Sequence, residues 1–106
     1  MLPSLARNKT AKYLVVTQGA LAGTRISLGT QPVLIGRADD STLVLTDDYA
    51  STRHARLSPR GSDWYVEDLG STNGTYLDRA KVTTAVRVPP LGTPVRVGKT
   101  VIELRP

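Results

Sequence analysis

Three short polar segments carry the side chains of this sequence that are best suited to bind an anion. They are Gly36-Arg37 at the end of an apolar run, Ser51-Thr52-Arg53-His54 one loop later, and Ser71-Thr72-Asn73-Gly74 further along. A guanidinium presents N–H donors in a planar fork that matches the oxygens of a phosphate or a carboxylate. Hydroxyl and amide groups supply further donors. These residue types predict recognition of an oxyanion, and phosphate is the first candidate.

Each segment also has a structural interpretation when it is taken alone. Asn73-Gly74 between two strand-like runs is the pattern of a two-residue hairpin turn. Arg37 fits an ordinary charge at a strand end, and His54, the only histidine, fits a buried residue that joins loops by hydrogen bonds. The combination of all three segments, in this order, is therefore what favours a binding site.

Catalytic and metal-binding chemistry fits the sequence poorly. The chain has no cysteine and one histidine, so thiolate and histidine-rich metal sites are excluded, and we expect no metal and no cofactor. A hydrolase that used Ser51, His54 and Asp68 would need a nucleophile on a strand-turn-helix elbow, which Gly-Ser-Thr-Asn-Gly does not match. We expect a hairpin turn at 98–99, and solvated turn residues without chemistry at the acidic pairs 39–40 and 47–48.

Composition favours an anionic partner, because the formal net charge is +5 and the pI is about 10.0. A small basic β-barrel that binds nucleic acid is therefore the main alternative function. However, the 14 basic residues are scattered, and one Trp and four Tyr are too few for a base-stacking platform, so we expect no nucleic acid. No 18-residue apolar run exists, so we expect no direct membrane insertion, and the lack of cysteine agrees with a cytoplasmic location.

Short runs with strand-like composition follow one another along the chain. They cover residues 12–18, 24–29, 32–37, 41–45, 54–58, 63–69, 75–77, 81–83, 94–98 and 100–104, and the first two are expected to form a hairpin. A turn is expected at 59–62. No stretch sustains a helical period, so the fold class is all-β, with residues 1–11 as a flexible tail or linker and 12–106 as one domain.

The three polar segments, in this order, resemble the hallmarks of a forkhead-associated (FHA) domain over residues 12–104. The flanking sequences "RHARL" and "DLGSTNGTYL" match the bacterial form of the family. The resemblance implies a twisted β-sandwich of about eleven strands, with binding loops at one end and the termini at the other. It also implies a module that binds phosphothreonine in partner proteins and is not an enzyme.

The resemblance also implies a role for individual residues. Arg37, Ser51, Thr52 and Thr72 are expected to contact the phosphate, Asn73 the peptide main chain, while Gly36, His54 and Gly74 support the site. Relatives often have a basic or polar residue at the position of Thr52, so one charged contact is weakened here. Small actinobacterial proteins of this kind are often tethered to the inner face of the membrane, so the resemblance implies a cytoplasmic location with a tether outside these 106 residues. The resemblance also implies partners among Ser/Thr kinases or their substrates, in envelope or cell-division signalling.

Overall fold

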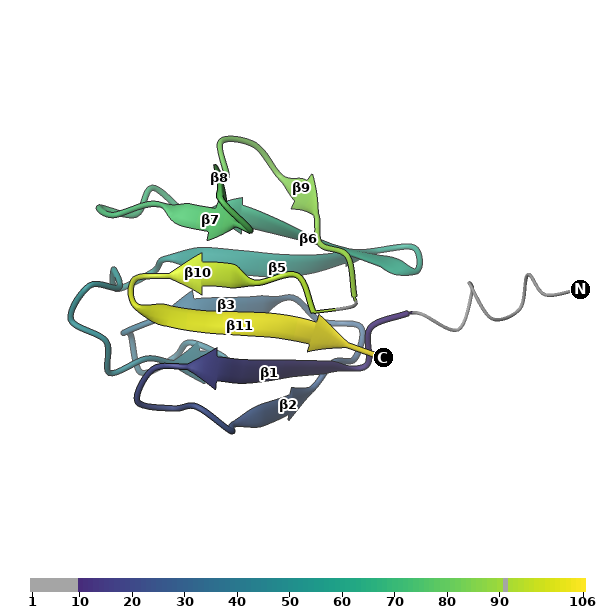
Figure 1. Ribbon diagram of the computed structural model, residues 1–106, viewed down its shortest axis with the longest axis horizontal. Helices are drawn as coiled ribbons and strands as arrows, with labels where there is room; N and C mark the ends of the chain where they lie inside the picture. The colour runs from purple at the N-terminus through teal and green to yellow at the C-terminus, as the bar shows by residue number, and fades with distance from the viewer. Residues whose placement is uncertain (1–9, 91) are drawn as a thin grey trace, which may run out of the picture.

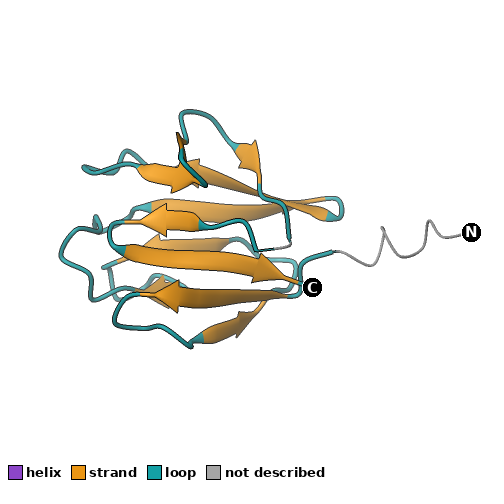
Figure 2. Ribbon diagram, in the orientation of Figure 1, coloured by secondary structure: helices purple, strands orange, loops and turns teal. Residues whose placement is uncertain are grey.

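The chain folds into two β-sheets that pack face to face (Figure 1). The computed structural model describes residues 10–90 and 92–106, and within these ranges it contains eleven strands and no helix (Figure 2). The strands are β1 (Tyr13–Gln18), β2 (Arg25–Ser27), β3 (Val33–Gly36), β4 (Leu43–Val44), β5 (Ala55–Arg60), β6 (Asp63–Asp68), β7 (Thr75–Leu77), β8 (Ala80–Lys81), β9 (Val86–Arg87), β10 (Val95–Val97) and β11 (Thr100–Arg105). The predicted all-β sandwich is confirmed.

One sheet has six strands in the order β2-β1-β11-β10-β7-β8, and the other has five in the order β4-β3-β5-β6-β9. The paired strands are antiparallel except for β3 and β4, which are parallel. The predicted hairpins β1–β2 and β10–β11 are both present. The two sheets remain separate, whereas the alternative function in nucleic-acid binding predicts a closed barrel.

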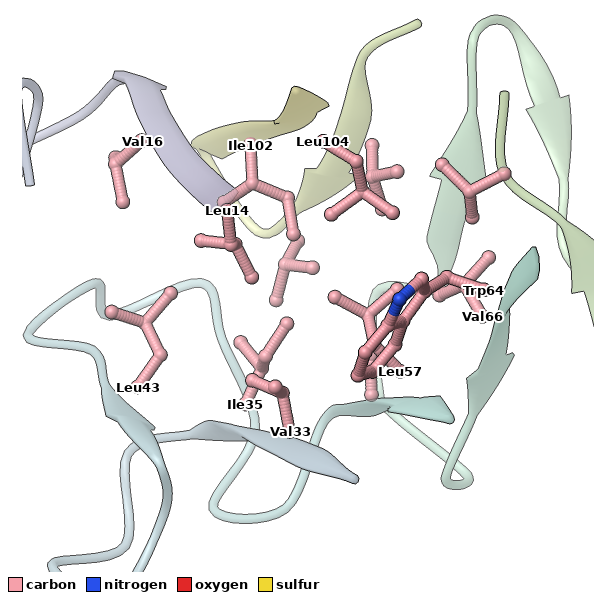
Figure 3. Close-up of a cluster of buried hydrophobic side chains, with 14 of the residues drawn as sticks. Leu14, Val16, Val33, Ile35, Leu43, Leu57, Trp64, Val66, Ile102 and Leu104 are labelled. Atoms are coloured by element: carbon pink, nitrogen blue, oxygen red, sulfur yellow. The ribbon is translucent and has the colours of Figure 1, made fainter. Parts of the chain in front are cut away.

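The core lies between the sheets and is built by alternation along the strands (Figure 3). Leu14 and Val16 of β1 and Ile102 and Leu104 of β11 point inward from the six-stranded sheet, and their neighbours along each strand are more exposed. The five-stranded sheet contributes inward-pointing side chains of Val33, Ile35, Leu57, Trp64 and Val66. Each fully buried side chain of this size stabilises the fold by about 1.5–3 kcal/mol. This core makes the sandwich a rigid support for its loops.

One local expectation about the strands is wrong, and one strand was not predicted. Pro59 and Arg60 belong to β5 rather than to a turn, because they pair with Trp64 and Asp63 of β6. The other neighbour of β5, β3, begins at Val33, opposite Leu57, so Pro59 lies beyond the start of β3. At that position no third strand requires the amide hydrogen that proline lacks. The short strand β9 was not expected. Of the predicted tail, residues 1–9 lie outside the described ranges, and Ala11 packs in the core.

The Asn73-Gly74 segment does not form the hairpin turn that its sequence suggests. β6 belongs to the five-stranded sheet and β7 to the six-stranded sheet, so the loop 69–74 crosses from one sheet to the other. Gly70 (φ 81°) and Gly74 (φ 84°) take the left-handed conformation, whereas Asn73 does not. This crossing places the loop beside the loops 37–42 and 45–54 at the left end of Figure 1, opposite the C-terminus.

Candidate anion-binding site

A cleft of about 520 Å³ opens at the loop end of the sandwich. Its lining residues are Arg37, Asp48, Tyr49, Ala50, Ser51, Thr52, Arg53, Gly70, Thr72 and Asn73. The structure thus brings together the five residues that sequence predicts to touch a ligand. The three predicted supporting residues, Gly36, His54 and Gly74, are buried behind this surface.

Arg37 follows β3 directly, and its backbone is docked onto the loop 45–54. Its amide donates to the Ser51 carbonyl at 3.1 Å, and the next amide, of Ala38, donates to the Thr52 carbonyl at 3.0 Å. The Arg37 side chain is 49% exposed, and its guanidinium lies 3.9 Å from the Asp48 carboxylate, which is itself 90% exposed. An ion pair between groups this exposed is weak. The guanidinium therefore keeps its donors free for a ligand.

Gly36 is required by the close approach of two backbones. A Cβ atom at this position would lie 2.2 Å from the carbonyl oxygen of Thr52, which is far inside van der Waals contact. The absence of a side chain is what lets the loop 45–54 lie against the end of β3. Gly36 thereby sets the position of Ser51 and Thr52 in the cleft.

The Ser51 hydroxyl lies at the junction of two loops. Its oxygen accepts a hydrogen bond from the amide of Thr72 at 3.0 Å. Accepting this bond leaves the Ser51 O–H hydrogen as a donor toward the cleft. The side chains of Thr52 and Thr72 are exposed beside it. Three hydroxyl groups and one guanidinium therefore surround the same space.

His54 is fully buried and connects both loops to the sandwich. Its Nδ1 accepts a hydrogen bond from the Ser51 amide at 3.0 Å, so the ring proton is on Nε2, which donates to the Gly74 carbonyl at 2.9 Å. The backbone amide of His54 donates to the Ile35 carbonyl, and the His54 carbonyl accepts from the Leu69 amide. Because both ring nitrogens are engaged by backbone groups, His54 does not contact the Ser51 hydroxyl as a catalytic base would.

Asp68 holds the loop 69–74 in shape. Its carboxylate accepts hydrogen bonds from the amides of Gly70 and Ser71, each at 3.0 Å, and from the hydroxyls of Ser71 and Thr75. Burial raises the pKa of Asp68, but these hydrogen bonds outweigh that effect, and the net result is a lowered pKa. Sequence reasoning considered Asp68 only as a member of a triad and missed this structural role.

Asp47 contradicts the expectation of a solvated turn residue. Its carboxylate accepts hydrogen bonds from the Tyr49 amide at 2.8 Å, the Lys99 amide at 2.6 Å and the Thr100 hydroxyl at 2.9 Å. Burial raises the pKa of Asp47, and these donors more than offset the effect, so its pKa is lowered. The contact with Tyr49 is a local turn that the sequence favours. The contacts with β11 and its hairpin carry no local sequence signal.

Two further contacts complete the site. The side-chain amide of Asn73 donates to the Tyr49 carbonyl at 2.8 Å. Arg53 forms an ion pair with Asp40 at 3.0 Å, and this contact lowers the pKa of the Asp40 carboxyl. Within residues 10–90 and 92–106 no group of three metal-ligating side chains exists, and none of the described segments is a helix that could span a bilayer.

Comparisons with known proteins agree with this geometry. A family model described as FHA domain matches residues 33–98. Over all 106 residues the chain is 83% identical to the FHA domain-containing protein FhaB of Mycolicibacterium smegmatis and covers 68% of that protein.

Two solved structures share the fold at 30% sequence identity. One comes from a structural and functional analysis of phosphothreonine-dependent FHA domain interactions; it has a TM-score of 0.78 and covers 89% of this chain and 94% of its own. The other is the FhaA FHA domain in complex with the intracellular domain of Rv3910; it has a TM-score of 0.77 and covers 88% of this chain and 98% of its own.

Proposed function

Because this chain belongs to the family of FHA domains, we propose that it binds phosphothreonine-containing segments of partner proteins in the cleft at its loop end. The observation that carries this proposal is the convergence of Arg37, Ser51 and Thr72, from three separate loops, on one cleft. The solved relatives support it, since one was studied for phosphothreonine-dependent interactions and another was solved with a protein partner.

The phosphate of phosphothreonine carries a charge of about −1.5 to −2 and three acceptor oxygens. In the proposed complex, the Arg37 guanidinium provides the charged contact and displaces its weak interaction with Asp48. The Ser51 hydroxyl donates its free hydrogen, and Thr52 and Thr72 add hydroxyl donors. The four side chains lie on loops that are already held by hydrogen bonds, so little ordering is needed on binding.

Asn73 has a different proposed role, at the main chain of the bound segment. Its amide nitrogen is held by the Tyr49 carbonyl, which fixes the direction of the side chain. Its Oδ1 atom then accepts a hydrogen bond from an amide of the extended ligand. Such a contact orients the segment without reading its side chains, whereas Arg37, Ser51 and the two threonines read the phosphate.

We further propose that the chain acts as a binding module and not as an enzyme. The fully engaged imidazole of His54 supports this, because a hydrolase would need that ring to accept a proton from the nucleophile. The proposed partners are Ser/Thr kinases or their substrates. The proposed location of this protein is the cytoplasm, with a membrane tether outside these 106 residues. A role in envelope or cell-division signalling belongs to the same proposal.

Titration of the domain with a library of oriented phosphothreonine peptides tests the function. We expect binding that requires the phosphate, with the unphosphorylated peptide of the same sequence as control. Binding should depend on a single phosphothreonine and persist with added salt, unlike binding to oligonucleotides, which weakens steeply as salt is raised. Equal affinity for phosphorylated and unphosphorylated peptides would contradict the proposal.

A further inference from the structure

Tyr49 is one of two large apolar side chains in the described ranges that remain exposed, and it lies on the rim of the cleft. The ammonium group of Lys99, from the β10–β11 hairpin, lies 4.3 Å from the centre of its ring. We propose that Tyr49 and Lys99 form a second anion subsite, which binds an acidic side chain of the same partner segment. This inference rests on the proposed function and deepens it.

The backbone of Tyr49 is held in place although the residue is 51% exposed. Its amide donates to the Asp47 carboxylate at 2.8 Å, and its carbonyl accepts from the Asn73 side chain at 2.8 Å. Both polar backbone groups of this residue are therefore fixed by neighbouring loops. An exposed aromatic ring on a fixed backbone, beside a binding cleft, provides contact area for a ligand with little further ordering.

Lys99 does not line the cleft itself but lies beside it, against the lining residue Tyr49, because its hairpin packs on the same loop. The Asp47 carboxylate accepts the Lys99 amide at 2.6 Å, so one side chain holds both members of the subsite. At Gly98 a Cβ atom would lie 2.9 Å from the Ala50 nitrogen and from the Tyr49 carbonyl carbon, so the approach leaves no room for a side chain. The β10–β11 hairpin thus adds a fourth loop to the binding end.

The charges around Lys99 leave it available for an anion. Both oxygens of Asp47 are occupied by the hydrogen bonds described above, and Asp48 faces Arg37. Among the ion pairs of residues 10–90 and 92–106, none involves Lys99. An ammonium stacked on a tyrosine ring keeps donors pointing away from the ring. A carboxylate, or a second phosphorylated side chain, supplies the complementary charge.

The experiment uses a phosphothreonine peptide with alanine at the flanking positions, and a series in which one glutamate occupies each of these positions in turn. Affinities are measured by fluorescence anisotropy for the parent, for Lys99→Gln and for Arg60→Gln. Arg60 is a matched control, because it stacks on Tyr65 at 4.5 Å in the β5–β6 hairpin at the opposite end of the sandwich.

At one position we expect glutamate to raise the affinity of the parent by about 2- to 5-fold, as suits one exposed charge pair. Lys99→Gln should lose this gain, and Arg60→Gln should keep it. A second phosphothreonine at that position should give a larger gain, because it carries up to about twice the charge. Lys99→Glu should reverse the preference and favour lysine there.

The outcomes separate the two proposals. If the alanine reference peptide fails to bind the parent, the proposed function is wrong, and the subsite falls with it. If the reference peptide binds but glutamate gives no gain at any position, or the gain survives in Lys99→Gln, the subsite is wrong while the phosphothreonine site stands.

Discussion

The hydroxyl oxygen of Ser51 accepts a hydrogen bond from the amide of Thr72 at 3.0 Å, which joins the β4–β5 loop to the loop that crosses between the sheets. A single side chain thus has two functions: it joins the loops, and it presents a donor to the cleft. Substitutions at the site therefore differ in how they divide their effects between affinity and stability, and the first three predictions use that difference.

Arg37→Ala should remove most phosphopeptide binding and leave the melting temperature unchanged. Truncating one partner of a charge pair that is desolvated in the complex costs about 2–5 kcal/mol, which is at least about a 30-fold loss of affinity. Arg60→Ala, at the other end of the sandwich, is the matched control. Isothermal titration calorimetry gives both affinities, and an Arg37→Ala variant that binds as tightly as the parent would place the site elsewhere. Ser51→Ala should weaken binding less.

His54→Ala should lower both the melting temperature and the affinity. The Ser51 amide and the Gly74 carbonyl would lose their partner, and a buried polar group left unpaired costs about 1–3 kcal/mol. In a domain of this size each kcal/mol lowers the melting temperature by about 4–8 °C. Scanning calorimetry with and without peptide checks this. An unchanged melting temperature with lost binding would instead indicate direct contact between His54 and the ligand.

Gly36→Ala should destabilise the domain and weaken binding together, because the new Cβ would lie 2.2 Å from the Thr52 carbonyl oxygen and must displace the loop. Forcing one methyl group into a closely packed site costs about 1–3 kcal/mol. Gly29→Ala is the control, since nothing lies within 4 Å of its Cβ position. If thermal melts and titrations showed the two variants to be alike, the close approach would not position the loop.

Phosphothreonine should be preferred over phosphoserine in otherwise identical peptides, because the family resemblance implies a pocket for the threonine methyl group. Burial of one methyl contributes about 0.8 kcal/mol, and the unfilled pocket left by serine adds a cavity penalty. A total of about 1.5–2.5 kcal/mol corresponds to a preference of roughly 10- to 70-fold. Competition measured by fluorescence anisotropy gives the ratio. Equal affinities would indicate a general anion cradle at Arg37, Ser51 and Thr72.

Asp68→Asn should make the free energy of unfolding less dependent on pH in the acid range. The folded-state pKa of Asp68 is lowered, so its stabilising contribution is present above the unfolded pKa, about 3.9, and is lost as pH falls through the folded value. The parent should therefore lose more stability than the variant between about pH 4 and the folded pKa. Asp78→Asn is a suitable control, because asparagine tolerates the positive φ of 57° at that position. Urea melts at several pH values test this.

The sequence predicts most of the sandwich because its signal is local. The alternating run of β1 buries Leu14 and Val16 between more exposed neighbours, β11 is a run of strand-forming residues, and the turn at 98–99 has hairpin residues at hairpin spacing. The two-residue strand β9 is too short for any period to appear, and the extension of β5 through Pro59 depends on where its neighbour β3 begins.

The lining of the cleft could also be predicted, since Arg37, Ser51 and Thr72 belong to recognisable segments. The contacts that hold those segments in place could not be predicted. Asp47 binds the amide of Lys99, which is 52 residues away in the chain. An aspartate that turns a loop and one that joins two distant loops look the same in sequence. For the same reason the hairpin interpretation of Asn73-Gly74 was wrong, because only the sheet order reveals that β6 and β7 are not paired.

The pairing of β1 with β11 has a mechanical consequence. Tyr13 lies opposite Arg105, so the outer ends of both strands lie side by side, at the end of the sandwich away from the cleft. Tension between these two ends would load the residue pairs of β1 and β11 one after another, starting at Tyr13 and Arg105, so a small force would separate the strands. Tension between Arg105 and a ligand held in the cleft runs along the strands instead and loads the bonds of β11 to β1 and β10 in shear, all at once. We therefore expect the domain to unfold at a lower force when it is stretched between Tyr13 and Arg105 than when it is pulled between Arg105 and its bound partner.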